Sequence, residues 1–278
     1  MPALPHATVV GQTTRAGRNS AEARRVAPLF DSLMWFAVLL LFLTVLGAGW
    51  STRLVPTAST VWMKPLLAFS GAYLFTLTIT HLLPEALLLE PDDMHRIGYF
   101  VLAGFFGQLV LEVFSQGVEH GHVHHHTSHA GHVPFLLLFS LIIHSFLEGS
   151  ILVKAPEAGT VSDNFYAILT GVALHHIPAA FALMAALMLR LGSFRRALPF
   201  LVLFALAAPV GIVVSNYVVL EQLLTGGLYA ALLGFVAGNF LHVSTTILFE
   251  TSPEHRLNLP KLAATMAGTA LALAVELL

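Results

Sequence analysis

The chain has 278 residues, of which 56% are hydrophobic and 10% are charged, and its formal net charge is −2. A soluble domain carries about 25% charged residues, so the composition excludes a soluble globular protein and predicts an all-α polytopic membrane protein. The near-neutral charge gives no sign of a nucleic-acid partner. The chain has no cysteine, which excludes disulfides, thiolate metal ligands and cysteine nucleophiles.

The first 28 residues are polar and include Arg15, Arg18, Arg24 and Arg25. They lack the short apolar stretch and small-residue cleavage site of a signal peptide. We therefore expect residues 1–28 to form a mobile, disordered tail and residues 29–278 to form one transmembrane domain.

Eight apolar segments in this domain approach the roughly 20 residues that a helix needs to cross a bilayer. The predicted spans are 30–50, 64–88, 97–115, 134–154, 164–190, 196–219, 226–250 and 260–278. In the sixth span, Pro209 and Gly211 predict a kink. The sequence therefore predicts eight transmembrane helices in a compact bundle.

Seven of the nine Lys and Arg residues after the tail lie next to the connectors that follow spans one, five and seven. Because cytoplasmic connectors carry an excess of positive charge, this distribution predicts that both termini lie outside. The connector between spans three and four is then cytoplasmic.

Two pairs of glycines lie at helical spacing, Gly104 with Gly107 and Gly234 with Gly238. Small residues allow transmembrane helices to approach closely. We interpret both pairs as packing within one chain, and a homodimer contact remains the alternative.

The most informative polar residues lie in the middle of apolar spans. His144 and Glu148 are four residues apart, so they share one face of a helix, and His175 and His176 precede Pro178 in the next span. A carboxylate at the bilayer centre costs about 2.5–3.5 kcal/mol on insertion scales and therefore needs a partner. Two imidazoles and a carboxylate suit divalent zinc, with water completing the coordination. The alternative is a structural His–Glu hydrogen bond between helices.

A second His–Glu pair, His81 with Glu85, flanks Pro84 near the end of the second span. This position is closer to a membrane surface, where desolvation costs less. It predicts either an access or secondary metal site, or an interfacial pair that caps the helix end.

Two other spans carry isolated polar residues. Asn239 and His242 lie three apart in the seventh span and are further candidates for a secondary metal site, with a core hydrogen bond as the alternative. In the third span, we interpret Gln108 as a packing residue and Glu112 as a charge near the interface.

The connector 119–133 reads EHGHVHHHTSHAGHV and contains seven histidines. They are His120, His122, His124, His125, His126, His129 and His132. Such tracts bind transition metals through a high local concentration of imidazole, so we predict a loop that captures metal. A pH-responsive loop is the alternative, because histidine titrates near neutrality.

Several of these motifs together resemble the ZIP family of divalent metal transporters. HSFLEG at 144–149 resembles the family's HN-x-x-EG signature, and LHHIP at 174–178 resembles its H-x-x-P-E-G motif. HLLPEA, GFFGQLVLE and AGNFLHVS in spans two, three and seven are also similar to family patterns, as are the eight spans and the His-rich loop. The resemblance covers nearly all of residues 30–278.

The resemblance implies movement of a divalent metal into the cytoplasm, with transport ligands at His144, Glu148 and His175 and a variable second-site position at His176. Two residues depart from the pattern, since the family's asparagine is Ser145 here and its glutamate is Ala179. Family members use both positions to hold a second metal. We therefore predict one metal, or one strong and one weak.

The predicted mechanism is alternating access, in which one group of helices rocks against the other around a midplane site. The ligands favour Zn²⁺ as substrate and would also accept Fe²⁺, Mn²⁺, Cd²⁺ or Co²⁺. The compact chain suggests a bacterial plasma membrane. The alternatives are a metal sensor on a transporter-like scaffold and, less favoured, a membrane metalloenzyme, for which HExxH and Gly-x-Ser-x-Gly motifs are absent.

Overall fold

The computed structural model describes residues 32–54, 62–115, 135–152, 165–218, 226–250 and 259–276, and within these residues the secondary structure is helical. The all-α prediction is therefore confirmed. The predicted tail 1–28 and the histidine loop 119–133 lie outside the described residues. The helices are Ser32–Ser51, α2 (Met63–Leu77), η2 (Thr78–Leu82), α3 (Leu83–Leu89), η3 (Pro91–Asp93), α4 (Met94–Ser115), α5 (Phe135–Ser150), α6 (Phe165–Leu191), α7 (Phe194–Ala205), α8 (Ala207–Val213), η5 (Val214–Val218), α10 (Gly226–Glu250) and α11 (Leu259–Glu276).

Six of the described helices are long and apolar enough to cross a membrane. They are Ser32–Ser51, Met63–Leu89, Pro91–Phe114, Phe165–Leu191, Phe194–Asn216 and Gly227–Phe249. Two shorter apolar helices, Phe135–Ser150 and Leu259–Val275, fall in the fourth and eighth predicted spans. The 16 residues of α5 extend only about 24 Å at 1.5 Å per residue, less than the hydrocarbon thickness of about 30 Å.

The chain divides into two units, Met1–Ala37 and Val38–Leu278. In the first unit the described residues, 32–37, are helical. All candidate site residues among the described residues belong to the second unit.

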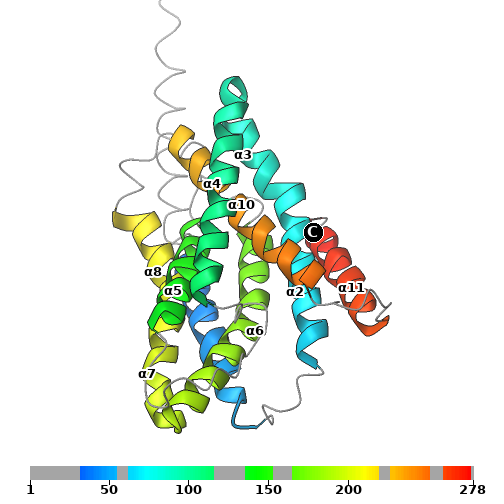
Figure 1. The fold of residues 1–278 in the computed structure, drawn as a ribbon. Coiled ribbons are helices and arrows are strands. Elements are labelled where there is room, and N and C mark those ends of the chain that lie inside the picture. Colours follow the sequence, from blue (N-terminus) through cyan, green and yellow to red (C-terminus); the bar gives the residue numbers. More distant parts are fainter. Residues whose placement is uncertain are drawn as a thin grey trace, which may run out of the picture. The chain divides into compact units, whose positions relative to one another are not determined.

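Within the second unit, the helices pack in two groups (Figure 1). In one group, α10 packs along α4 and against α2 and α3, and α11 lies beside α2. In the other, α5 packs against α8 and α7, and α6 packs against α7. Contacts of α2 with α6 and of α4 with α5 join the two groups.

Glycines set the closest helix approaches. A Cβ at Gly104 would collide with the backbone carbonyl of Phe235, and one at Gly238 with that of Val101. Only glycine allows α4 and α10 to approach this closely. The interpretation of these glycines as packing within one chain is confirmed, and the homodimer remains a prediction.

The predicted kink in the sixth span is present. Proline has no N–H to donate to the carbonyl four residues earlier, which for Pro209 is that of Ala205, and α7 ends at Ala205 while α8 begins at Ala207. The neighbouring Gly211 has a different role, because a Cβ there would collide with the backbone carbonyl oxygen of Phe146 in α5.

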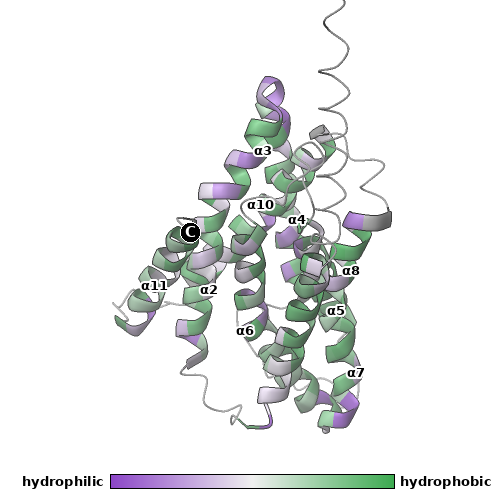
Figure 2. Cartoon of the chain, turned by 180° about the vertical axis from the view of Figure 1, so that it is seen from behind, coloured by the Kyte–Doolittle hydropathy of each residue, from purple (hydrophilic) through white to green (hydrophobic). Residues whose placement is uncertain are grey.

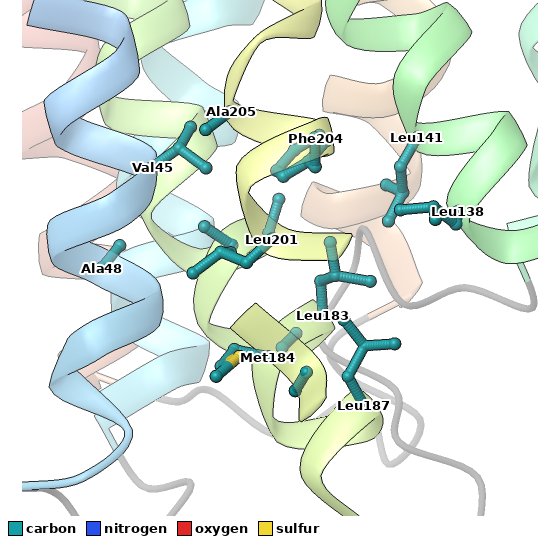
Figure 3. Packing of buried hydrophobic residues seen from close by; sticks show 14 of the residues in the cluster. Val45, Ala48, Leu138, Leu141, Leu183, Met184, Leu187, Leu201, Phe204 and Ala205 are labelled. Atoms are coloured by element: carbon teal, nitrogen blue, oxygen red, sulfur yellow. The ribbon is translucent and has the colours of Figure 1, made fainter. Parts of the chain in front are cut away.

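Apolar side chains fill the centre of the α5–α8 group (Figure 3). The cluster includes Val45, Ala48, Leu138, Leu141, Leu183, Met184, Leu187, Leu201, Phe204 and Ala205. Outside, large apolar side chains remain exposed, including Phe106, Val113 and Phe139, as expected for surfaces that face lipid. Hydrophobic residues cover most of each helix, and hydrophilic residues gather towards helix ends such as that of α3 (Figure 2).

Candidate metal site

Helix α5 presents a histidine and a glutamate on one face, as their spacing predicts. His144 Nε2 lies 3.3 Å from Glu148 Oε1, and both side chains are buried. Neither of these two atoms has a hydrogen-bond partner among the described residues. A buried carboxylate oxygen without a hydrogen bond is unfavourable, so the space between these two atoms is suited to receive a cation.

Helix α6 contributes the third group. His144, Glu148 and His175 each offer a ligand atom, and these atoms all lie within 4.8 Å of one another. The ring centroids of His144 and His175 are 5.7 Å apart, with the rings nearly perpendicular at 81°. The three residues therefore converge from two helices on one buried point.

The distances can be compared with those of a zinc site. Two ligands about 2.0–2.1 Å from one tetrahedral Zn²⁺ lie about 3.3–3.4 Å apart. The 3.3 Å between His144 Nε2 and Glu148 Oε1 matches this spacing. The ligand atoms of all three residues lie within 4.8 Å of one another.

His176 lies on the other side of the carboxylate. Its Nε2 is 2.7 Å from Glu148 Oε2 and 3.3 Å from Ser145 Oγ. Its ring packs against Phe204, with ring centroids 5.8 Å apart. Of the four residues predicted as metal ligands, the structure groups three and gives the fourth a hydrogen bond to the glutamate. Ser145, which replaces the family's asparagine, contacts His176.

Two amide side chains continue this polar cluster into the other helix group. Asn239 Nδ2 of α10 donates to Gln108 Oε1 of α4 at 2.9 Å, and the same oxygen lies 3.2 Å from His144 Nδ1. Both amides are buried. Gln108 is buried, as its interpretation as a packing residue requires, but its hydrogen bonds within the cluster were not predicted. The sequence feature that pointed to this role was a glutamine within an apolar span. By itself, this feature does not show which residue the glutamine contacts.

The remaining predicted residues lie apart from the three-ligand cluster. His242 of α10 bonds to Glu112 of α4, with 2.5 Å between Nε2 and Oε2, so Glu112 serves as a partner for a histidine in addition to lying near the helix end. His81 and Glu85 line a hollow of about 360 Å³ together with Thr80, Pro84, Leu88 and Leu89. His81 lies in the π-helical turn η2, a geometry that is frequent at functional sites.

The sequence was compared with known proteins. A search of curated proteins gives no match. A family model described as ZIP zinc transporter matches residues 116–276, which is more than half of the chain and includes all helices from α5 to α11. Members of this family are integral membrane proteins that transport zinc and other divalent metals as substrates. With this match, the chain belongs to the ZIP zinc transporter family.

Proposed function

We propose that the protein carries zinc into the cytoplasm through the buried site formed by His144, Glu148 and His175. The observation that carries this proposal is the convergence of three ligand-type groups within 4.8 Å, all buried, on helices α5 and α6. In an apolar bundle such groups are costly. A divalent cation that they coordinate would offset this cost.

The site takes one strongly held metal. Glu148 uses its two oxygens differently, because Oε1 faces His144 while Oε2 accepts from His176. His176 therefore orients the carboxylate, and water completes the zinc coordination. Ala179 is buried among apolar side chains, so the position at which the family has a glutamate supplies no second ligand here.

The transport path starts near His81 and Glu85, where a hydrated cation first binds in the hollow of about 360 Å³. The ion then sheds water at the midplane site and leaves towards the histidine loop 119–133. Asn239 and His242 remain candidates for a secondary contact along the path. The α5–α8 group rocks against the group containing α4 and α10 to expose the site alternately.

Both termini lie outside and the histidine loop is cytoplasmic in this proposal. The guanidinium carbon of Arg53 lies 4.6 Å from the ring centroid of Phe194, so the end of the first helix and the start of α7 share one end of the bundle. The charge-based orientation requires this common end, because it places both connectors on the same, cytoplasmic side. The proposed location is a bacterial plasma membrane.

Zinc-65 uptake into proteoliposomes tests the proposal. The informative variant is Glu148→Gln, which keeps the side-chain volume and removes the charge. The matched control is Glu90→Gln, which removes one carboxylate at the end of α3, outside the cluster. We expect uptake to fall at least 10-fold in the first variant and to persist in the second, since removal of a ligand removes substrate binding.

Two results would contradict the proposal. Normal uptake by Glu148→Gln would exclude the carboxylate as a transport ligand. Saturable zinc binding without uptake by the native chain would favour the metal sensor, and a competition series with Fe²⁺, Mn²⁺, Cd²⁺ and Co²⁺ would then establish whether another metal is transported.

A further inference from the structure

The hydrogen bonds of one amide oxygen decide where the proton of His144 lies. Gln108 Oε1 is 2.9 Å from Asn239 Nδ2 and 3.2 Å from His144 Nδ1. A carbonyl oxygen can only accept hydrogen bonds. With the Gln108 amide in this orientation, His144 Nδ1 carries a hydrogen that it donates to Gln108 Oε1.

A neutral imidazole carries one N–H, so His144 Nε2 then has a lone pair. This lone pair faces Glu148 Oε1 at 3.3 Å, and neither atom has a hydrogen-bond partner among the described residues. Two acceptors that face each other across this distance repel one another. A cation between them converts the repulsion into coordination.

Asn239 holds the Gln108 amide in the required orientation. If the Gln108 amide turned by half a rotation, its NH₂ group would face both Asn239 Nδ2 and His144 Nδ1. As long as Asn239 presents its NH₂ group, the contact with Asn239 would then join two donors, which is unfavourable in a buried site. Gln108 is 1% exposed and Asn239 is also 1% exposed, so water does not relieve this mismatch. A turn of both amides would instead let Gln108 donate to Asn239 Oδ1 and to His144 Nδ1, so the orientation of Asn239 sets the tautomer of His144.

We propose that Asn239 and Gln108 are positioning residues that fix the tautomer of His144, so that Nε2 is available to zinc. The assignment of His144 as a zinc ligand is part of the proposed function, and the relay through Gln108 and Asn239 goes beyond it. The relay also connects α10 and α4 to the metal ligand on α5. Hydrogen bonds to a metal-ligating histidine from residues that do not touch the metal typically alter metal affinity about 10–100-fold.

Two variants that each add one carboxylate give opposite outcomes. In Asn239→Asp the new side chain accepts only, so the Gln108 amide turns to donate to it. Its NH₂ group then also donates to His144 Nδ1, and the imidazole proton moves to Nε2. In Gln108→Glu the carboxylate still accepts from both neighbours, and the tautomer stays as it is.

The zinc dissociation constant of the purified full-length protein, measured for its tightest site, separates the relay from simple electrostatics. The relay predicts that Asn239→Asp weakens zinc binding 10–100-fold and that Gln108→Glu binds as tightly as the native chain or more tightly. Electrostatics alone predicts tighter binding in both variants, because both add negative charge near a cation. Tighter or unchanged binding by Asn239→Asp would overturn the relay.

The tautomer of His144 can also be measured directly in the metal-free protein, which tests the relay without any assumption about zinc transport. The ¹⁵N NMR signals of the His144 ring, assigned by difference from His144→Gln, report which nitrogen carries the hydrogen. We expect it on Nδ1 in the native chain and on Nε2 in Asn239→Asp; a hydrogen on Nε2 in the native chain would overturn the relay. If the NMR result is as expected but His144→Gln binds zinc as tightly as the native chain, the relay stands and the proposed zinc site fails.

A buried amide outside the relay provides the folding control. Asn216 donates from Nδ2 to the carbonyls of Leu152 and Ile212, away from His144. Asn216→Asp introduces the same chemical change as Asn239→Asp and should leave the zinc dissociation constant within about 3-fold of the native value, far from the 10–100-fold range. An equal loss of affinity in both variants would mean that Asn239 acts through general stability, which contradicts the relay.

Discussion

The close contact between α5 and α8 leads to a prediction about Gly149, the residue that follows the buried glutamate. A Cβ built at Gly149 would collide with the carbonyl oxygen of Ala208 and would lie 2.8 Å from both the carbonyl carbon and the Cα of that residue. Favourable carbon–carbon contacts lie at about 3.5–4.0 Å. The obstacle is backbone and cannot rotate away. Gly149→Ala would therefore require α5 and α8 to separate by at least about 0.7 Å to bring the carbon contacts into this range, and by more to clear the carbonyl oxygen.

The net effect combines two opposing contributions. Overpacking of a rigid contact costs about 1–3 kcal/mol, and the backbone obstacle places this site in the upper half of that range. Alanine regains about 1 kcal/mol of helix propensity relative to glycine. We therefore expect Gly149→Ala to lower the free energy of unfolding by about 1–2 kcal/mol.

Equilibrium unfolding by sodium dodecyl sulfate in mixed micelles would measure this change, with Gly98→Ala as the control. Gly98 also lies inside a helix, but a Cβ there has nothing within 4 Å. The control should therefore gain up to about 1 kcal/mol. Equal effects of the two substitutions, or stabilisation by Gly149→Ala, would refute the packing argument.

Three further predictions concern the pH dependence of zinc binding, the carboxylate that is missing at Ala179, and the contact between Arg53 and Phe194. Zinc affinity should fall between pH 7.5 and about pH 5, because protons compete with the metal for imidazole nitrogens; constant affinity in a binding titration would exclude histidine ligands. Without metal, Ala179→Glu should lower the free energy of unfolding by about 3–5 kcal/mol, because it buries an unpaired charge. Excess zinc should raise the lowered melting temperature part of the way back. An unchanged free energy of unfolding without metal would show that the position is solvated. Arg53→Leu should lower the free energy of unfolding by about 0.5–1 kcal/mol, because the cation–π interaction with Phe194 is lost, and Arg53→Lys should lower it less. Equal decreases in the free energy of unfolding for the two variants would show that the ring of Phe194 contributes nothing.

The sequence predicted the helices and one side of the site well, because both depend on local spacing. Runs of about 20 apolar residues require helices in a bilayer, so each predicted segment contains an observed helix. The four-residue interval between His144 and Glu148 determines that they share a face. The meeting of α5 with α6 was inferred only from the equal depth of their polar residues.

What the sequence could not supply are contacts that depend on how helices rotate against one another. Gln108 lies 36 residues from His144, and their hydrogen bond follows from the packing of α4 on α5. Likewise, no local spacing shows that His176 bonds to the Glu148 oxygen opposite His144. The glycine pairs Gly104 with Gly107 and Gly234 with Gly238 indicated close packing, but the identity of the partner helix requires the fold.

The central claim is that zinc binds between His144, Glu148 and His175. Anomalous diffraction at the zinc edge, from crystals of the full-length protein grown with zinc, tests it most directly. The account predicts a strong peak within about 2.0–2.2 Å of one atom from each of the three side chains, with His176 still bonded to the far oxygen of Glu148. A strong peak elsewhere, with none between these three residues, would contradict it.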